Sequence, residues 1–225
     1  MKKIRCLRVD FSGEIAAYEI PAFRGAIIHK VGQDHILFHN HQGENGFRYM
    51  YPLIQYKRVH QKPVLFCLDE GVDEIHQFFQ QRDWTINISG RQLDMKIDRM
   101  DMKQYTMQVW DRMFSYRIGQ WVALNQEAYR SYQQMEGLVD QIRLLEKILT
   151  GNILSFAKGI GWTIEKEVLV KITDLERIGL VNLKSQKVMA FTLSFQSNVF
   201  LPDYTGLGKS VSIGFGMVQQ YKNRN

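Results

Sequence analysis

With 225 residues, of which 45% are hydrophobic and 23% charged, the chain has enough apolar content to form cores and too much to be a disordered segment. Its length suits two small domains, and a formal net charge of +6 favours a polyanionic partner, nucleic acid before an acidic protein or a membrane surface. No apolar run approaches the ~20 residues of a membrane span, charges interrupt the N-terminal segment, and the two cysteines lack zinc-site spacing. These features predict a soluble, cytoplasmic protein with reduced thiols and no membrane contact.

The first half of the chain predicts the order strand, helix, strand, strand, helix, strand. Apolar and charged residues alternate over 4–11, as in a half-buried strand. Pro21 opens a helix that ends at Gly32, and a loop-like stretch follows over 33–46. The remaining elements are expected at 51–60, 62–68, 72–81 and 84–101. This is the order of the split β-α-β motif of a ferredoxin-like domain.

The second half predicts a degenerate copy of the same motif. Aromatic residues favour a strand within 107–124, and apolar spacing predicts the clearest helix of the chain at 137–158. A helix at 126–134 and strands at 162–172, 180–183, 187–195 and 211–221 complete the expectation. The sequence therefore predicts an α+β fold of two tandem ferredoxin-like (βαββαβ) domains, 1–104 and 105–225, the second carrying a glycine-rich loop.

That loop, residues 202–216, places two Gly-x-Gly pairs around Lys209 and two serines. Backbone N–H groups of such a loop can converge on an anion, and the lysine adds a charge. The pattern is neither a P-loop nor a dinucleotide fingerprint, because a strand rather than a helix is expected after it. A phosphate-binding loop and a structural glycine hairpin without a ligand both remain open.

His39 and His41, one residue apart in the loop after the first helix, are the candidates for acid–base chemistry near neutral pH. On RNA, one histidine could take the proton of a ribose 2′-OH as that oxygen attacks the adjacent phosphorus, while the other protonates the leaving 5′-oxygen. No metal is needed, because the nucleophile belongs to the substrate. The alternatives are loop histidines without a task and metal ligation. His35 could substitute for either one.

Two further patterns have competing interpretations. The acidic residues of 69–74 would have to converge to serve a two-metal nuclease, whereas a turn followed by a helix N-terminus explains them more simply. Segments 47–49 and 55–58 interleave aromatic and basic residues, as single-stranded RNA recognition requires. A solvated basic sheet face over buried tyrosines explains those segments equally well.

Taken together, these features resemble the RAMP superfamily of RNA-binding proteins, and within it the CRISPR repeat-cleaving endoribonucleases. The resemblance covers essentially the whole chain. It is carried by the glycine loop, by Leu37-Phe38-His39-Asn40-His41, and by Arg48-Tyr49-x-Tyr51-Pro52-Leu53-Ile54-Gln55-Tyr56-Lys57.

The resemblance implies an endoribonuclease that cuts each repeat of the precursor transcript by 2′-OH attack. Its products would carry 5′-OH and 2′,3′-cyclic phosphate ends, guide RNAs would be released, and no metal or other cofactor would take part. His39 and His41 are the implied catalytic residues, with base and acid unassigned. The implied RNA-binding residues are Lys30, Arg48, Tyr49, Lys57, Gly206, Gly208, Lys209, Ser210, Ser212, Gly214 and Gly216.

The implied partners are CRISPR repeat RNA, as precursor and as mature guide, and other CRISPR effector subunits. Monomer and homodimer both stay open. The alternative function within the superfamily is a non-catalytic RNA-binding RAMP subunit of an effector complex, since some members bind RNA without cutting it.

Overall fold

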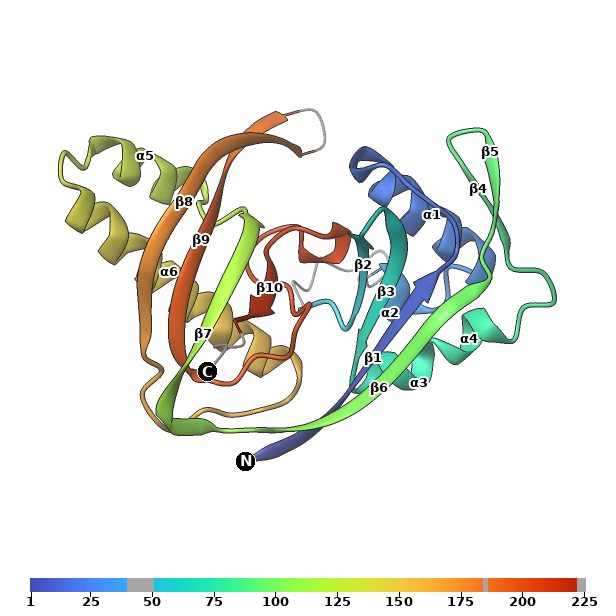
Figure 1. Cartoon of the computed structure of the whole chain (residues 1–225), viewed down its shortest axis with the longest axis horizontal. Coiled ribbons are helices and arrows are strands. Elements are labelled where there is room, and N and C mark those ends of the chain that lie inside the picture. The colour runs from blue at the N-terminus through green and yellow to red at the C-terminus, as the bar shows by residue number, and fades with distance from the viewer. Residues whose placement is uncertain (40–50, 184–185, 222–225) are drawn as a thin grey trace. The chain divides into compact units, whose positions relative to one another are not determined.

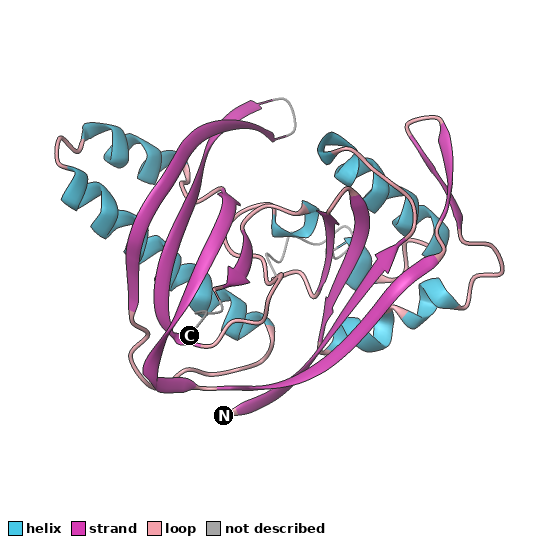
Figure 2. Cartoon of the chain, in the orientation of Figure 1, coloured by secondary structure: helices cyan, strands magenta, loops and turns pink. Residues whose placement is uncertain are grey.

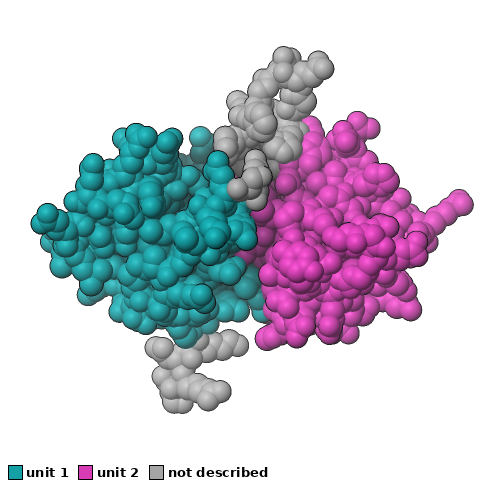
Figure 3. Space-filling model, turned by 90° about the horizontal axis from the view of Figure 1, so that it is seen from above, with its two compact units in different colours: residues 1–2, 107–211, 215–225 teal, residues 3–106, 212–214 magenta. Residues whose placement is uncertain are grey.

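The computed structural model describes residues 1–39, 51–183 and 186–221, so that His41, Arg48 and Tyr49 lie outside the described residues. The chain forms two compact units (Figure 3). Residues 3–106 together with 212–214 make up the N-terminal unit, and residues 1–2, 107–211 and 215–225 make up the C-terminal unit.

The N-terminal unit is a four-stranded sheet in the order β2-β3-β1-β6, with its helices on one face (Figure 1). Along the chain its elements are β1 (Lys2–Phe11), a 3₁₀ turn (Ala17–Glu19), α1 (Ile20–Val31), α2 (Ile36–His39), β2 (Ile54–Val59), β3 (Lys62–Leu68), α3 (Glu70–Glu74), α4 (His76–Phe79), β4 (Thr85–Ile88), β5 (Arg91–Asp94) and β6 (Ile97–Met107). Strand β3 pairs antiparallel with β1 and with β2. The order confirms the predicted ferredoxin-like motif, to which the β4–β5 hairpin is added.

Edge-to-face aromatic rings connect the sheet of this unit to its helices. The ring centroids of Phe11 and Phe23 lie 6.4 Å apart, those of Phe23 and Tyr56 5.5 Å, and those of Phe11 and Phe78 6.0 Å. All four side chains are fully buried, which joins β1, β2, α1 and α4 in one core.

The C-terminal unit repeats this topology with one helix of the motif missing. Its elements are β7 (Val109–Trp121), α5 (Gln126–Gln134), α6 (Leu138–Gly159), β8 (Val170–Leu183), β9 (Gln186–Val199) and β10 (Met217–Gln220). The sheet order β10-β7-β9-β8 is again fourth-first-third-second along the unit. Residues 200–216, all of them described, contain a 3₁₀ turn (Val211–Ile213) but no α-helix. The predicted degenerate second copy is confirmed.

Helix α6 covers one face of this sheet (Figure 2) because its apolar residues recur at helical spacing. Leu145, Leu149 and Ile153 are completely buried, as are Phe191 and Phe195 of β9. Apolar burial of this kind stabilises by roughly 1.5–3 kcal/mol per side chain.

Several predicted elements were wrong in type or extent, among them the strand expected at 84–101, which is divided among β4, β5 and β6. The strand expected at 162–172 begins only at Val170. Trp162 is still bonded to the end of α6, because Gly161 (φ 66°) turns the chain there and the Trp162 N–H donates to the Ala157 carbonyl oxygen at 2.8 Å. The strand expected at 211–221 begins at Met217. The helix expected at 72–81 is divided into α3 and α4, and the stretch expected to be a loop contains the short helix α2, with His39 as its last residue.

The glycine-rich loop approaches its own backbone so closely that side chains are excluded. A Cβ on Gly216, whose φ is 63°, would lie 1.8 Å from the carbonyl oxygen of Leu207. The Leu207 N–H donates to the Gly216 carbonyl oxygen at 2.8 Å, and the Val218 N–H donates to Thr205 at 2.9 Å. Glycine at 216 is therefore a requirement of the fold.

We expect Gly216→Ala to lower the free energy of unfolding by roughly 2 kcal/mol or more, because the methyl group adds a clash to left-handed backbone strain. Gly151→Ala is the matched control. A Cβ there would meet nothing within 4 Å on helix α6, so this variant should gain about 0.5–1 kcal/mol. Urea unfolding of both variants measures the difference, and equal stability would contradict the close approach.

Candidate functional site

The last turn of α2 is held by hydrogen bonds to its backbone. The Tyr56 hydroxyl of β2 donates to the carbonyl oxygen of Phe38 at 3.1 Å. The guanidinium of Arg24, on α1, donates to the carbonyl oxygen of His39. Both donors belong to elements of the core, so they fix the position of the His39 backbone. Sequence reasoning gave neither residue this function, and no local signal marks Arg24.

The imidazole of His39 is oriented by the turn that precedes α2. Its Nε2 lies 2.8 Å from the carbonyl oxygen of Gln33. Because a carbonyl only accepts, Nε2 carries the hydrogen, and Nδ1 holds the lone pair when the ring is neutral. The side chain is half-buried.

His35 and the acidic residues near it form ion pairs. Nδ1 of His35 lies 2.7 Å from Oε1 of Glu74, and Arg5 makes two hydrogen bonds to Asp73, at 2.6 and 2.8 Å. The carboxylates predicted as a possible metal site are thus partly occupied by basic partners. Within residues 1–39, 51–183 and 186–221, no three His, Cys, Asp or Glu side chains are grouped to hold a metal ion.

The two predicted lysines of this unit have opposite environments. Nζ of Lys30 lies 3.0 Å from Asp83 and donates to the Thr85 carbonyl oxygen at 2.8 Å, which ties α1 to the start of β4. Lys57 is completely buried, and its Nζ has no hydrogen-bond partner in the part of the chain that is described. Burial lowers the pKa of Lys57 from 10.5 to about 7.

Lys57 lies on the sheet face opposite the helices, since it follows Tyr56 and successive strand residues alternate between faces. In register it is opposite Val64, which is in turn opposite Asp10. The carboxylate of Asp10 already accepts two hydrogen bonds from Arg8, at 2.6 and 2.7 Å. Asp10 is therefore already engaged by Arg8 and does not neutralise a charge on the buried Lys57 amine.

The first part of the glycine loop is fixed by packing within the C-terminal unit. Gly206 forms a bridge with Met217. A Cβ on Gly208 would lie 2.6 Å from the Trp121 indole. The Lys209 N–H donates to the carbonyl oxygen of Val122, and its Nζ donates to that of Leu124 at 2.9 Å. Partial burial lowers the pKa of Lys209.

The loop then contributes to the other unit. Ser210 has a positive φ of 57°, and Ser212–Gly214 belong to the N-terminal unit, where Ile213 packs against the core. A Cβ on Gly214 would lie 3.3 Å from the Tyr56 carbonyl oxygen and 3.8 Å from Cα of Lys57. The structure thus brings Gly214 beside β2 at Lys57 and groups Ser212 with the same unit, while the other predicted loop residues stay in the C-terminal unit.

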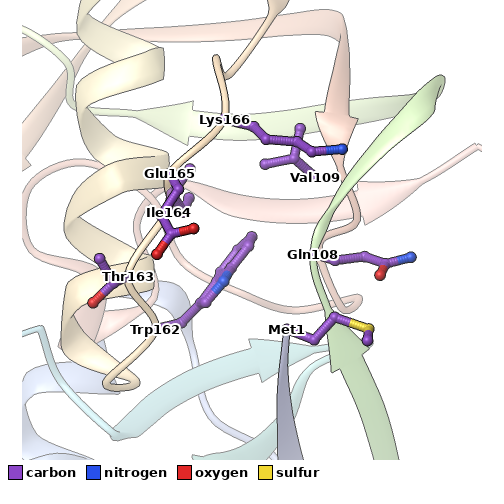
Figure 4. Close-up of a pocket in the computed structure, with 8 residues that line it drawn as sticks. All are labelled: Met1, Gln108, Val109, Trp162, Thr163, Ile164, Glu165 and Lys166. Atoms are coloured by element: carbon purple, nitrogen blue, oxygen red, sulfur yellow. The ribbon is translucent and has the colours of Figure 1, made fainter.

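Two cavities in the described part of the C-terminal unit are not lined by any predicted site residue. One, of about 310 Å³, surrounds the segment after α6 (Figure 4). A second, of about 420 Å³, shares Trp162, Thr163 and Ile164 with it. The first is lined by Met1, Gln108, Val109, Trp162, Thr163, Ile164, Glu165 and Lys166.

Two sheets of the same ferredoxin-like order in one chain, with a histidine after the first helix and a glycine loop before the last strand, define a tandem RAMP-type protein. Family models of the Cas6b N-terminal and C-terminal domains match residues 2–106 and 108–221. The chain belongs to the Cas6b family, which confirms the resemblance seen in the sequence.

Solved structures agree with this assignment. A crystal structure of Cas6b is 26% identical, with a TM-score of 0.88 over 98% of this chain and 100% of that one. A Cas6b described as a CRISPR RNA processing endoribonuclease is 23% identical, with a TM-score of 0.73 over 98% and 100% of the two chains, and shows the same fold.

A curated relative extends the comparison to an archaeon. An uncharacterised protein of Methanocaldococcus jannaschii, MJ0978, is 37% identical over 111 residues, which cover 49% of this chain and 74% of that protein. Separately, none of the described helices combines the length and apolar character that a membrane span requires.

We expect Lys57→Met to stabilise the protein, most strongly below pH 7. There both folded and unfolded states keep the proton, and the folded state bears the full cost of a buried charge. Between pH 7 and 10.5 the unfolded state holds more protons than the folded state, so wild-type stability rises with pH and the advantage of the variant shrinks.

Thermal unfolding at pH 6 and pH 9.5 tests this difference. Lys96→Met serves as the control, since that side chain is 77% exposed and should show no such trend. An advantage of Lys57→Met that stayed constant with pH would contradict a depressed pKa.

Proposed function

We propose that the protein is an endoribonuclease that cleaves CRISPR repeat RNA in the precursor transcript and so releases guide RNAs. The observation that carries the proposal is membership of the Cas6b family along both units of the chain. It is supported by the similarity to a Cas6b described as a CRISPR RNA processing endoribonuclease. The cytoplasm is the compartment that this function implies, and both precursor and mature guide RNA are the partners it implies.

In the proposed reaction His39 is the general base. The neutral ring takes the proton of the ribose 2′-OH, while its contact with the Gln33 carbonyl oxygen orients the ring. The 2′-oxygen forms a bond to the adjacent phosphorus, and the bond from phosphorus to the 5′-oxygen breaks. His41 gives a proton to that oxygen, which leaves a 2′,3′-cyclic phosphate and a 5′-OH. The nucleophile belongs to the substrate, so the steps require no metal ion.

Basic residues are proposed to stabilise the charge on the phosphorane, and Lys30, Arg48 and Lys57 are the candidates. Tyr49 is a further proposed RNA contact that could assist the histidine. A phosphate close to the Lys57 amine would favour its protonated form and raise the pKa that burial lowers. An unpaired buried amine destabilises the fold, so this position combines a cost in stability with a benefit in catalysis.

The glycine loop remains a proposed RNA contact. Its residues are Gly206, Gly208, Lys209, Ser210, Ser212, Gly214 and Gly216. Two of its glycines also meet packing requirements, so the side chains of Lys209 and the two serines are the informative positions. Lys209 would have to exchange its bond to Leu124 for one to phosphate.

We expect the protein to cut a labelled repeat RNA in EDTA, and a 2′-deoxy nucleotide at the cleavage site to block the cut, because the 2′-oxygen is the nucleophile. His39→Ala and His41→Ala should each lower the single-turnover rate by ~10²–10⁴-fold. His76→Ala, which removes an exposed histidine bonded to Gln80, is the control and should cleave normally.

Tight binding of the cognate repeat without cleavage would instead indicate a non-catalytic RNA-binding RAMP subunit. Cleavage only after a divalent metal is added would contradict 2′-OH chemistry at the histidine pair.

A substrate with sulfur in place of the 5′-oxygen should separate the two histidines. Thiolate leaves without protonation, so His41→Ala should recover most of its lost rate on this RNA. His39→Ala should stay slow, because the 2′-OH still needs a base. Recovery of His39→Ala alone would exchange the two roles.

A further inference from the structure

An arginine of the C-terminal unit is stacked on aromatic rings at a break in the sheet. Strand β7 pairs with β9 at Val109↔Val199 and again at Phe114↔Ser197, so that five residue steps of β7 face two of β9. The additional residues leave the ladder and bulge. Bulges redirect side chains, and this one carries Trp110 and Arg112.

The bulge brings two rings and a guanidinium together. The ring centroids of Trp110 and Phe114 lie 6.1 Å apart, edge to face. The guanidinium carbon of Arg112 lies 5.4 Å from the Trp110 ring and 4.7 Å from the Phe114 ring. The ring centroids of Phe114 and Phe200 lie 5.5 Å apart, edge to face. Rings on both sides of its sequence position restrict the rotamers of Arg112 before any ligand arrives.

The hydrogen-bonding capacity of this cluster is unused. Arg112 is exposed and makes no ion pair or hydrogen bond within the described residues, unlike Arg117 on the same strand, which lies 2.8 Å from Glu176. The Trp110 Nε1–H is buried and also has no partner there. Burial raises the pKa of Tyr116, and Asp203 and Arg112 both have smaller effects on it. The carboxylate of Asp203 already accepts a hydrogen bond from the Gln220 N–H at 2.6 Å.

The cluster thus offers donors and no acceptor. Its natural complement is a planar or tetrahedral anion with several acceptor oxygens, and a guanidinium held by its stacked face keeps its N–H edge available for bidentate contact. A neutral ligand would leave the positive charge of Arg112 without a counter-charge, on a chain whose net charge is +6.

We propose that Arg112, held by Trp110 and Phe114, binds a backbone phosphate of the RNA. The site lies at the beginning of the segment that leads into the glycine loop, since Phe200 is part of the cluster. The inference rests on the proposed function only in taking RNA as the ligand. Arg112 is a binding residue here, without a role in the bond-breaking step.

The test is the salt dependence of RNA binding. Uncleavable repeat RNA, with 2′-deoxy at the cut site, is titrated at several KCl concentrations. For single strands each neutralised phosphate contributes about 0.7 to the log–log slope. Arg112→Gln should lower the slope by about 0.7 and weaken binding about tenfold, whereas Arg112→Lys should keep most of the slope.

Arg143→Gln on α6 is the control, because that arginine is exposed and lies 3.5 Å from Asp140. Thermal unfolding shows whether Arg112→Gln is folded, and Arg112→Ala, which also removes the charge, carries the test if it is not. An unchanged slope and affinity would overturn the phosphate site, and so would weaker binding with an unchanged slope, which indicates a base contact.

Cleavage by the wild type separates the two proposals. If the wild type cleaves and Arg112→Gln binds normally, the phosphate site fails and the proposed function stands. If the wild type binds without cleaving and the slope falls in Arg112→Gln, the phosphate site stands and the proposed function fails.

Discussion

The path of residues 206–216 depends on positions where no side chain fits. At Gly216 a Cβ would collide with the carbonyl oxygen of Leu207, and at Gly208 it would collide with Trp121. These approaches let the chain bridge to β10, turn through a positive φ at Gly214, and place Ile213 in the core of the N-terminal unit. The segment that completes one sheet therefore also supplies three residues to the other unit. Residues 206–216 are needed for the architecture whether or not they bind RNA.

In the N-terminal unit, two neighbouring residues of β2 serve opposite faces of the sheet. Tyr56 points into the helix side, packs on Phe23, and fixes the last turn of α2 through its hydroxyl. Lys57 points to the other side, and its buried amine has no hydrogen-bond partner among the residues that the structure describes. Period-two alternation makes both outcomes inseparable, because shifting the register by one residue would exchange the faces of the two side chains. The position of His39 and the burial of Lys57 thus follow from one strand register.

The fold was predictable from the sequence because its signals are periodic and local. Helix α1, with Pro21 in its first turn and Gly32 as its C-cap, and the apolar spacing along α6 follow from rules that need no tertiary information. The strand expected from Val211 could not be rejected in this way, since the packing of Ile213, one of its alternating apolar residues, in the other unit is not visible in the sequence. The family followed from motif residues, whereas the hydrogen bond from Arg24 to the His39 carbonyl oxygen depends on chain segments 15 residues apart. The sequence around Trp110, Arg112 and Phe114 did contain a signal, an arginine on the apolar face of a strand, whose meaning required the bulge to be seen.

The net charge known from composition does not show which basic residues are available to a ligand, whereas the ion pairs in the structure do. A net charge of +6 counts every basic residue alike, yet Arg5, Arg8, Lys30, Lys62, Arg91 and Arg117 each lie within 3.0 Å of a carboxylate oxygen. Such pairs present little unbalanced charge to a ligand. Lys57 and Arg112 are different, because neither has a carboxylate partner among the described residues. One is buried and loses its proton easily, while the other is exposed and permanently charged. A polyanion gains most at groups whose charge is not already compensated, so the pairing of each basic residue, rather than their number, indicates where RNA should bind.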